Sequence, residues 1–193
     1  MDSLDRRAML VGTLATAGVA AMHAPSLAAK PKPAVRLPVD LFEMTMNEAR
    51  SQRRMRLLAD AMGKRVVALN FMFTGCSSVC PMQSTLLSRT QKLMAPRMGR
   101  DVVFLSISIS PLGDTPKKLR AFAKNHGAGP GWLFLAGDFV ETNRLQKAFE
   151  AYEARRDDHP PVICIGKASS TRWSRLYGMP RPDTIARELN AWL

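Results

Sequence analysis

The chain alternates short, almost wholly apolar segments with longer segments of helical character, and this alternation restricts its fold more than any other feature. Residues 66–73 and 102–109 are apolar nearly throughout, which is typical of strands covered on both faces. Further strands are expected at 132–135, 162–165 and 173–177. The Ser-Ser-Thr stretch at 169–171 would join the last two strands in a hairpin.

Segments with helical spacing or helix end signals fill the intervals between these strands. The clearest start signal is Asp114-Thr115-Pro116, in which Asp or Thr caps the helix and Pro occupies its first turn, and Gly127 is a stop signal. The expected helices cover 43–60, 82–94, 117–125, 141–152 and 182–192. This order predicts an α/β fold in which a central mixed sheet, with an antiparallel edge, is flanked by helices.

Residues 1–28 have the layout of an export signal. Arg6 and Arg7 precede an uncharged stretch over 8–22, and small residues around Ala28 form a cleavage site. Adjacent arginines ahead of a weakly hydrophobic core are typical of a twin-arginine signal, which predicts a periplasmic protein. An uncleaved membrane anchor is the alternative, because the uncharged stretch is only slightly shorter than a membrane span.

The rest of the chain is long enough for one domain with its own core. Residues 29–40 contain several Pro and Lys residues and are interpreted as a linker, and 41–193 as the domain. The formal net charge of +12 favours an acidic protein partner or anionic lipid headgroups. Nucleic acid is not expected as a partner, because the basic residues are scattered and are not grouped with aromatic residues.

Most of the functional argument depends on two cysteines, Cys76 and Cys80, which follow the first buried strand and open a helix. A thiol at a helix N-terminus faces unpaired N–H groups and the positive end of the helix dipole, and both favour the thiolate. In α/β sheets the chemistry also collects at the carboxyl ends of the parallel strands, where Cys76 would lie. The third cysteine, Cys164, lies within an apolar strand and is interpreted as a buried small hydrophobe.

The number of available ligands limits which metal the two cysteines can bind. Thiolates select Cu(I), Zn(II) or iron–sulfur clusters, but structural zinc needs four protein ligands and cubane clusters usually need four cysteines. Two thiolates with one further ligand suit low-coordinate Cu(I) best. Signal cleavage would remove His23 and leave His126 and His159 as candidates.

His126 and His159 differ in where the sequence places them. His126 ends a predicted helix, where carbonyl groups and the helix dipole give an imidazole a structural role. His159 lies in a loop just before a predicted strand that could adjoin the cysteine loop, and is preferred on this placement. Its neighbours Asp157 and Asp158 could orient the imidazole from outside the metal's own ligands.

Three sequence segments together resemble the Sco/SenC proteins: TGCSSVCP at 74–81, SPLGDTP at 110–116, and Asp158-His159 ahead of an apolar strand. The resemblance covers residues 64–193 and implies a thioredoxin-like fold. It also implies that Cys76, Cys80 and His159 are copper ligands. In the family, the residue corresponding to Asp114 belongs to a motif near the metal loop, whereas a simple helix cap is the alternative for this residue.

The resemblance further implies a role in assembling the dinuclear copper centre of cytochrome c oxidase. A periplasmic metallochaperone of this kind would deliver copper to an oxidase subunit, or adjust its thiols, without enzymatic turnover. A thioredoxin-like reductant is then expected as a second partner, and the membrane as a contact through the oxidase or an uncleaved N-terminus.

Two redox functions compete with the metallochaperone hypothesis. In a thiol-disulfide oxidoreductase, Cys76 would attack a partner disulfide and Cys80 would resolve the mixed disulfide. A thioredoxin-type motif has two residues between its cysteines, whereas three separate Cys76 from Cys80, a spacing that suits a metal chelate at least as well. A peroxiredoxin-type peroxidase is the third hypothesis, and rapid peroxide consumption through a sulfenic acid would favour it.

Overall fold

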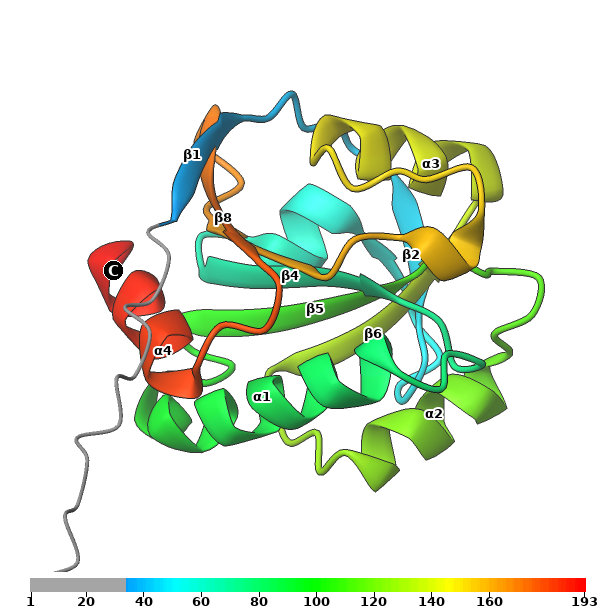
Figure 1. The fold of residues 1–193 in the computed structure, drawn as a ribbon, viewed down its shortest axis with the longest axis horizontal. Helices are drawn as coiled ribbons and strands as arrows, with labels where there is room; N and C mark the ends of the chain where they lie inside the picture. Colours follow the sequence, from blue (N-terminus) through cyan, green and yellow to red (C-terminus); the bar gives the residue numbers. More distant parts are fainter. Residues whose placement is uncertain (1–33) are drawn as a thin grey trace, which may run out of the picture. The chain divides into compact units, whose positions relative to one another are not determined.

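An eight-stranded mixed sheet organises the residues that the computed structural model describes, 34–193 (Figure 1). The strand order is β1-β8-β7-β4-β5-β6-β2-β3. The strand bounds are β1 Val35–Pro38, β2 Thr45–Glu48, β3 Arg54–Arg56, β4 Val66–Met72, β5 Val102–Ser108, β6 Trp132–Gly137, β7 Val162–Gly166 and β8 Arg172–Tyr177. Only β4, β5 and β6 pair in parallel, and the other pairs are antiparallel.

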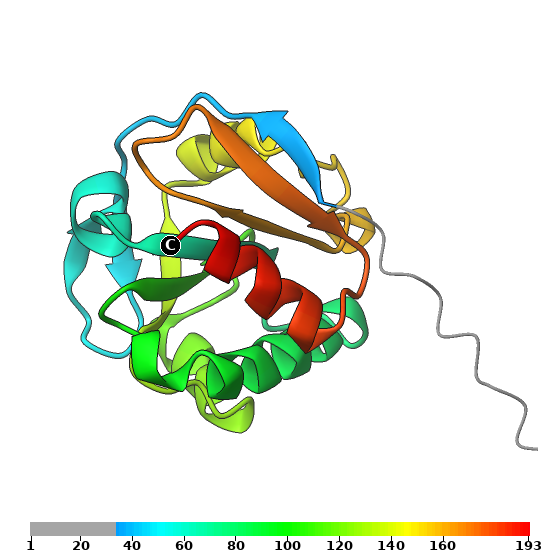
Figure 2. The same ribbon diagram turned by 90° about the vertical axis from the view of Figure 1, so that its left-hand side faces the viewer.

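Four α-helices cover the two faces of this sheet. They are α1 Val79–Leu93, α2 Pro116–Asn125, α3 Phe139–Ala148 and α4 Pro182–Ala191. In Figures 1 and 2, α1 and α2 lie below the sheet and α3 lies above it. Three short helices complete the fold: a π-helix at Leu57–Met62, and 3₁₀ turns at Ala95–Arg97 and Arg156–Asp158.

The sheet register brings three loops that are distant in the sequence to the same end. In the parallel β4–β5 pair, Met72 lies opposite Ser108, so the loops that follow both strands leave from one end. Strand β7 runs antiparallel to β4, and Val67 pairs with Gly166. The loop before β7 therefore also lies at the carboxyl end of β4, although it is far away in the sequence.

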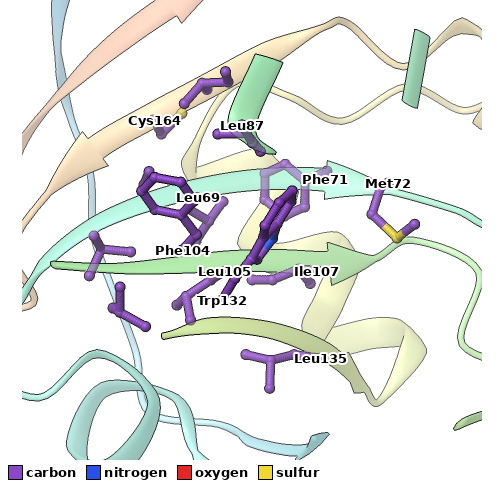
Figure 3. Packing of buried hydrophobic residues seen from close by; sticks show 14 of the residues in the cluster. Leu69, Phe71, Met72, Leu87, Phe104, Leu105, Ile107, Trp132, Leu135 and Cys164 are labelled. Carbon is purple, nitrogen blue, oxygen red and sulfur yellow. The ribbon is translucent and has the colours of Figure 1, made fainter. Parts of the chain in front are cut away.

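A chain of hydrogen bonds between buried polar groups crosses the largely apolar core. Figure 3 shows Phe104 and Trp132 among the buried residues. The Trp132 indole N–H donates to Ser106 Oγ at 2.9 Å, and Ser106 Oγ donates to Asn70 Oδ1 at 2.8 Å. Asn70 Nδ2 in turn donates to Gln83 Oε1 on α1 at 2.9 Å. This chain fixes the first turns of α1 against β4, because breaking it would leave buried polar groups unpaired.

The structure confirms most of the predicted elements, including the β7–β8 hairpin and the helices at 182–192 and 117–125. The helix predicted at 43–60 is wrong: the segment contains β2, β3 and the start of the π-helix. Met44 and Met46 are both buried with Glu48, an alternation of period two. Glu48 obscured this strand pattern, because its carboxylate is buried and accepts the Ser51 N–H at 2.6 Å.

Two predictions concern the region before β2. The predicted signal at 1–28 lies outside the described residues, as does the start of the predicted linker at 29–40. Within that linker, residues 35–38 form β1, whose backbone pairs with β8 from Val35–Arg175 to Pro38–Arg172. Part of the predicted linker at 29–40 is thus an edge strand of the domain. None of the helices within residues 34–193 combines the length and the apolar character needed to cross a membrane.

Candidate metal centre

The two cysteines lie where β4 gives way to α1. Cys76 is in the connecting loop and partly exposed, whereas Cys80 is in the first turn of α1 and buried. The Cys80 backbone N–H donates to Cys76 Sγ, with an N···S distance of 3.4 Å. The three cysteines, including Cys164, are free thiols.

The two thiols differ in acidity because their surroundings differ. Burial alone would raise the pKa of Cys76, but the N–H groups of Cys80 and Ser78 outweigh it and place the pKa below its ordinary value. Burial raises the pKa of Cys80 well above its ordinary value. Cys76 is therefore the thiol that more readily becomes a thiolate.

His159 meets Cys80 across a long stretch of sequence. The imidazole Nε2 lies 4.0 Å from Cys80 Sγ, and both side chains are buried. The ring also packs edge-on against Phe73, with ring centroids 6.0 Å apart. Phe73 directly follows β4, and His159 precedes β7, so the antiparallel β4–β7 pairing positions this contact.

The backbone carbonyl of Arg156 helps to orient the His159 ring. Nδ1 lies 3.1 Å from the Arg156 carbonyl oxygen. Because a carbonyl can only accept, the proton belongs on Nδ1, and the lone pair of Nε2 faces Cys80. Burial lowers the pKa of His159, which favours this neutral form. Asp157 and Asp158, which the sequence suggested as orienting groups, do not hydrogen-bond to the His159 ring. Both are exposed, and Asp158 pairs with Arg155 at 3.3 Å.

Asp114 holds the cysteine loop, and it is not the cap of α2. The cap is Thr115, whose side chain accepts the Lys118 N–H at 3.3 Å. Asp114 is buried and accepts hydrogen bonds from the Thr74 N–H at 3.0 Å, from the Thr74 hydroxyl, and from Ser108 Oγ at 2.7 Å. This carboxylate joins the loop after β5 to the residue that follows Phe73. No sequence signal identified Thr74 and Ser108 as its partners.

The remaining candidates lie away from this cluster. His126 Nδ1 is 2.9 Å from the Phe122 carbonyl oxygen, and its ring stacks on Phe122 with centroids 4.2 Å apart. Cys164 is fully buried in β7, and burial raises its pKa to about 12. Both residues have the structural surroundings that the sequence indicated for them.

The donor set fits a soft metal ion. Metal–sulfur and metal–nitrogen bonds of about 2.3 and 2.0 Å would together span the separation between Cys80 Sγ and His159 Nε2. The sulfurs are soft ligands, and the neutral imidazole presents its lone pair to the same space. In residues 34–193 no three His, Cys, Asp or Glu side chains already form a complete metal-binding cluster. Cys76 Sγ adjoins Cys80, whose backbone N–H it accepts at 3.4 Å.

A pocket of about 580 Å³ opens beside the cysteine loop. Phe73, Thr74 and Gly75 form one side of it, and Lys118 and Arg156 lie on its border. The Arg156 guanidinium lies 4.8 Å from the centre of the Phe73 ring and donates to Ser110 Oγ at 2.8 Å. The cysteine loop is therefore accessible from this side.

The fold and this arrangement define a class of protein: a thioredoxin-like α/β domain with a cysteine pair at the start of its first α-helix. Comparison with known proteins identifies the family within that class. The SCO1/SenC family matches residues 48–169, and the chain belongs to this family. The predicted thioredoxin-like fold is thereby confirmed.

Individual relatives agree with this assignment. The chain is 37% identical over 98 residues to a SCO1 protein homolog of Bacillus subtilis, a match that covers 49% of this chain and 50% of the relative. The chain thus spans about half the length of that relative. The crystal structure of a SCO1/SenC family lipoprotein from Bacillus anthracis has a TM-score of 0.70 and 21% identity, and the match covers 81% of this chain and 96% of that one. Copper-bound ScoI of Bradyrhizobium japonicum has a TM-score of 0.65 and 18% identity, with 81% and 99% covered.

Proposed function

We propose that this protein is a periplasmic metallochaperone that binds copper as cargo through Cys76, Cys80 and His159. The observation that carries the proposal is the approach of His159 Nε2, in the loop before β7, to Cys80 Sγ, in the first turn of α1, at a distance of 4.0 Å. A histidine with its Nδ1 proton bound to a carbonyl and its Nε2 facing a thiol has the geometry of a metal ligand. Membership of the SCO1/SenC family supports copper as the metal.

Transfer of the cargo would proceed by ligand exchange at the exposed member of the site. Cys76 is the partly exposed ligand, so an acceptor thiol can displace it before Cys80 and His159 release the ion. We propose a cytochrome c oxidase subunit with a dinuclear copper site as the acceptor. A thioredoxin-like protein would keep the two cysteines reduced, because only the thiolates bind the metal.

The test is the copper stoichiometry of the reduced full-length protein under anaerobic chelator competition. We expect one tightly bound copper per chain, and weaker binding in Cys76→Ser and Cys80→Ser. Cys164→Ala is the matched control, because it removes a thiol that lies in the core away from the site. Equal losses of copper affinity in all three variants would contradict the proposed site. The absence of any copper binding in competition with the chelator would also contradict it.

A thiol-disulfide oxidoreductase is the second candidate function. The contrast between the two cysteines supports it, because Cys76 is partly exposed with a lowered pKa, whereas Cys80 is buried with a raised pKa. In this reaction the Cys76 thiolate attacks a partner disulfide and releases one partner thiol. Cys80 then attacks the mixed disulfide, so the partner leaves reduced and the Cys76–Cys80 pair becomes oxidised.

Both functions predict that alkylation distinguishes the two thiols. In the reduced, metal-free protein, iodoacetamide should modify Cys76 at least about tenfold faster than Cys80, because Cys76 is both more accessible and more acidic. Peptide mass spectrometry over a time course measures the two rates separately. Similar rates for both residues would mean that the first turn of α1 opens readily in solution.

A further inference from the structure

Basic side chains gather at the end of the sheet opposite to the cysteine loop. Lys64 precedes β4, Arg97 and Arg100 precede β5, and Lys167 follows β7. The β4–β5 pairing is parallel and the β4–β7 pairing is antiparallel, so these positions share the amino end of β4. This end, with the C-terminus beside it, lies on the left in Figure 1 and faces the viewer in Figure 2.

The same side chains line a hollow of about 400 Å³. Its lining contains five basic residues and one acidic residue, listed in full as Lys64, Arg65, Val66, Arg97, Arg100, Asp101, Lys167 and Leu193. Asp101 is already paired with Arg100 at 2.9 Å, and Arg65 donates to the Ala61 carbonyl at 2.7 Å. The exposed side chains of Lys64 and Arg97 form no ion pair among the described residues. Lys64 and Arg97 are therefore exposed cations without a carboxylate in direct contact, although Arg100 and, to a lesser degree, Arg97 lower the pKa of Asp101.

We propose that this basic end, defined by Lys64, Arg97, Arg100 and Lys167, binds the phosphate groups of anionic phospholipids at a membrane surface. The hollow would receive a headgroup phosphate while the surrounding cations contact neighbouring lipids. The cysteine loop and His159, at the other end of β4, then face away from the membrane. The proposal depends on neither copper binding nor disulfide exchange.

The composition of this surface distinguishes a lipid from other anionic partners. A stable protein interface buries an apolar core, whereas the apolar lining residues here are only Val66, which is buried, and Leu193. Sites for single-stranded nucleic acid use aromatic side chains for base stacking, and the hollow has none. Flexible cations drawn from several segments suit the mobile headgroups of a bilayer, which need no fixed complementary shape.

The experiment measures co-sedimentation of the full-length protein with phosphatidylglycerol vesicles and with phosphatidylcholine vesicles. Any binding through residues 8–22 would contribute to both vesicle types. The readout is therefore the increment, defined as the binding to phosphatidylglycerol vesicles in excess of the binding to phosphatidylcholine vesicles. The double variant Lys64→Gln/Arg97→Gln should reduce that increment about 30-fold, since each basic residue near an anionic surface contributes about 1 kcal/mol. Raising the salt concentration should weaken it further.

The control removes the same charge at the other end of the sheet. Lys117 is in the first turn of α2 and Arg181 precedes α4, and both are exposed. Lys117→Gln/Arg181→Gln should change the increment by less than about threefold, because these charges would face away from the bilayer. Equal losses in the two double variants would mean that net charge alone drives binding, and would overturn the proposal.

Two further readouts complete the test. Cys76 should react with a water-soluble alkylating reagent at the same rate in bound and free protein, whereas slower reaction on vesicles would place the cysteine end against the membrane. Inorganic phosphate at matched ionic strength should not release the protein. Release by phosphate would indicate a site for the free anion, and no preference for anionic vesicles would exclude a lipid surface; both results would overturn the proposal.

Discussion

The largest effect on copper binding is expected for His159→Ala, which should weaken copper retention at least about 100-fold and leave Cys76–Cys80 disulfide exchange intact. The imidazole Nε2 of His159 lies 4.0 Å from Cys80 Sγ. Its removal leaves two sulfurs for the ion, while the thiols that exchange disulfides are unchanged. Anaerobic chelator competition measures the first property, and reduction of a model disulfide the second.

His126→Ala is the matched control for this prediction. His126 stacks on Phe122, and its Nδ1 contacts a backbone carbonyl of α2. Its removal should leave copper affinity within about twofold of the wild-type value, because it touches none of the proposed ligands. Copper affinity that survives in His159→Ala would contradict the three-ligand site, whereas a parallel loss of disulfide exchange would show that the whole loop had been disturbed.

Asp114→Ala should lower the free energy of unfolding by about 3 kcal/mol and also weaken copper binding. The substitution removes the acceptor of three hydrogen bonds, two from Thr74 and one from Ser108. It leaves the partly buried Thr74 donors and the buried Ser108 hydroxyl without this acceptor. Thr74 lies two residues before Cys76, so the cysteine loop loses its attachment to the loop after β5. Urea unfolding measures the first effect, and chelator competition under native conditions measures the second.

Thr115→Ala separates this attachment from helix capping. Thr115 is the residue whose side chain caps α2, so its loss should cost only about 1 kcal/mol. It should not change copper binding, because no bond from Thr115 reaches the cysteine loop. If Asp114→Ala cost no more than Thr115→Ala and left copper affinity unchanged, the carboxylate would have no special role in positioning Cys76.

Much of the fold could be predicted from the sequence because its central strands are buried on both faces. Continuous apolar runs at 66–73 and 102–109 have few alternatives to a covered parallel strand. The segment 43–60 was harder, because β2 and β3 are short and Glu48 interrupts the apolar alternation. Only the turn that binds the Glu48 carboxylate explains why a charged residue occupies a buried strand position.

The sequence was sufficient to predict which loops form the candidate site, but not the hydrogen bonds that position its side chains. The order of strands indicated that the cysteine loop and the loop of His159 could adjoin, and the β4–β7 pairing shows that they do. The role of these residues as copper ligands stays a prediction. The Arg156 carbonyl that orients His159 could not be inferred, because any residue type supplies a carbonyl. The acids beside His159 suggested a different orienting group, but solvation keeps them at the surface.

The antiparallel pairing of β7 with β4 has a consequence for when copper can be acquired. Until β7 joins the sheet, a newly made chain has the two thiols but no nearby imidazole, since His159 and Cys80 are 79 positions apart. In the proposed site, tight copper retention therefore belongs only to molecules that have completed their fold. Copper would then be bound by folded protein and not by incompletely folded chains, so only folded molecules would carry copper to an acceptor.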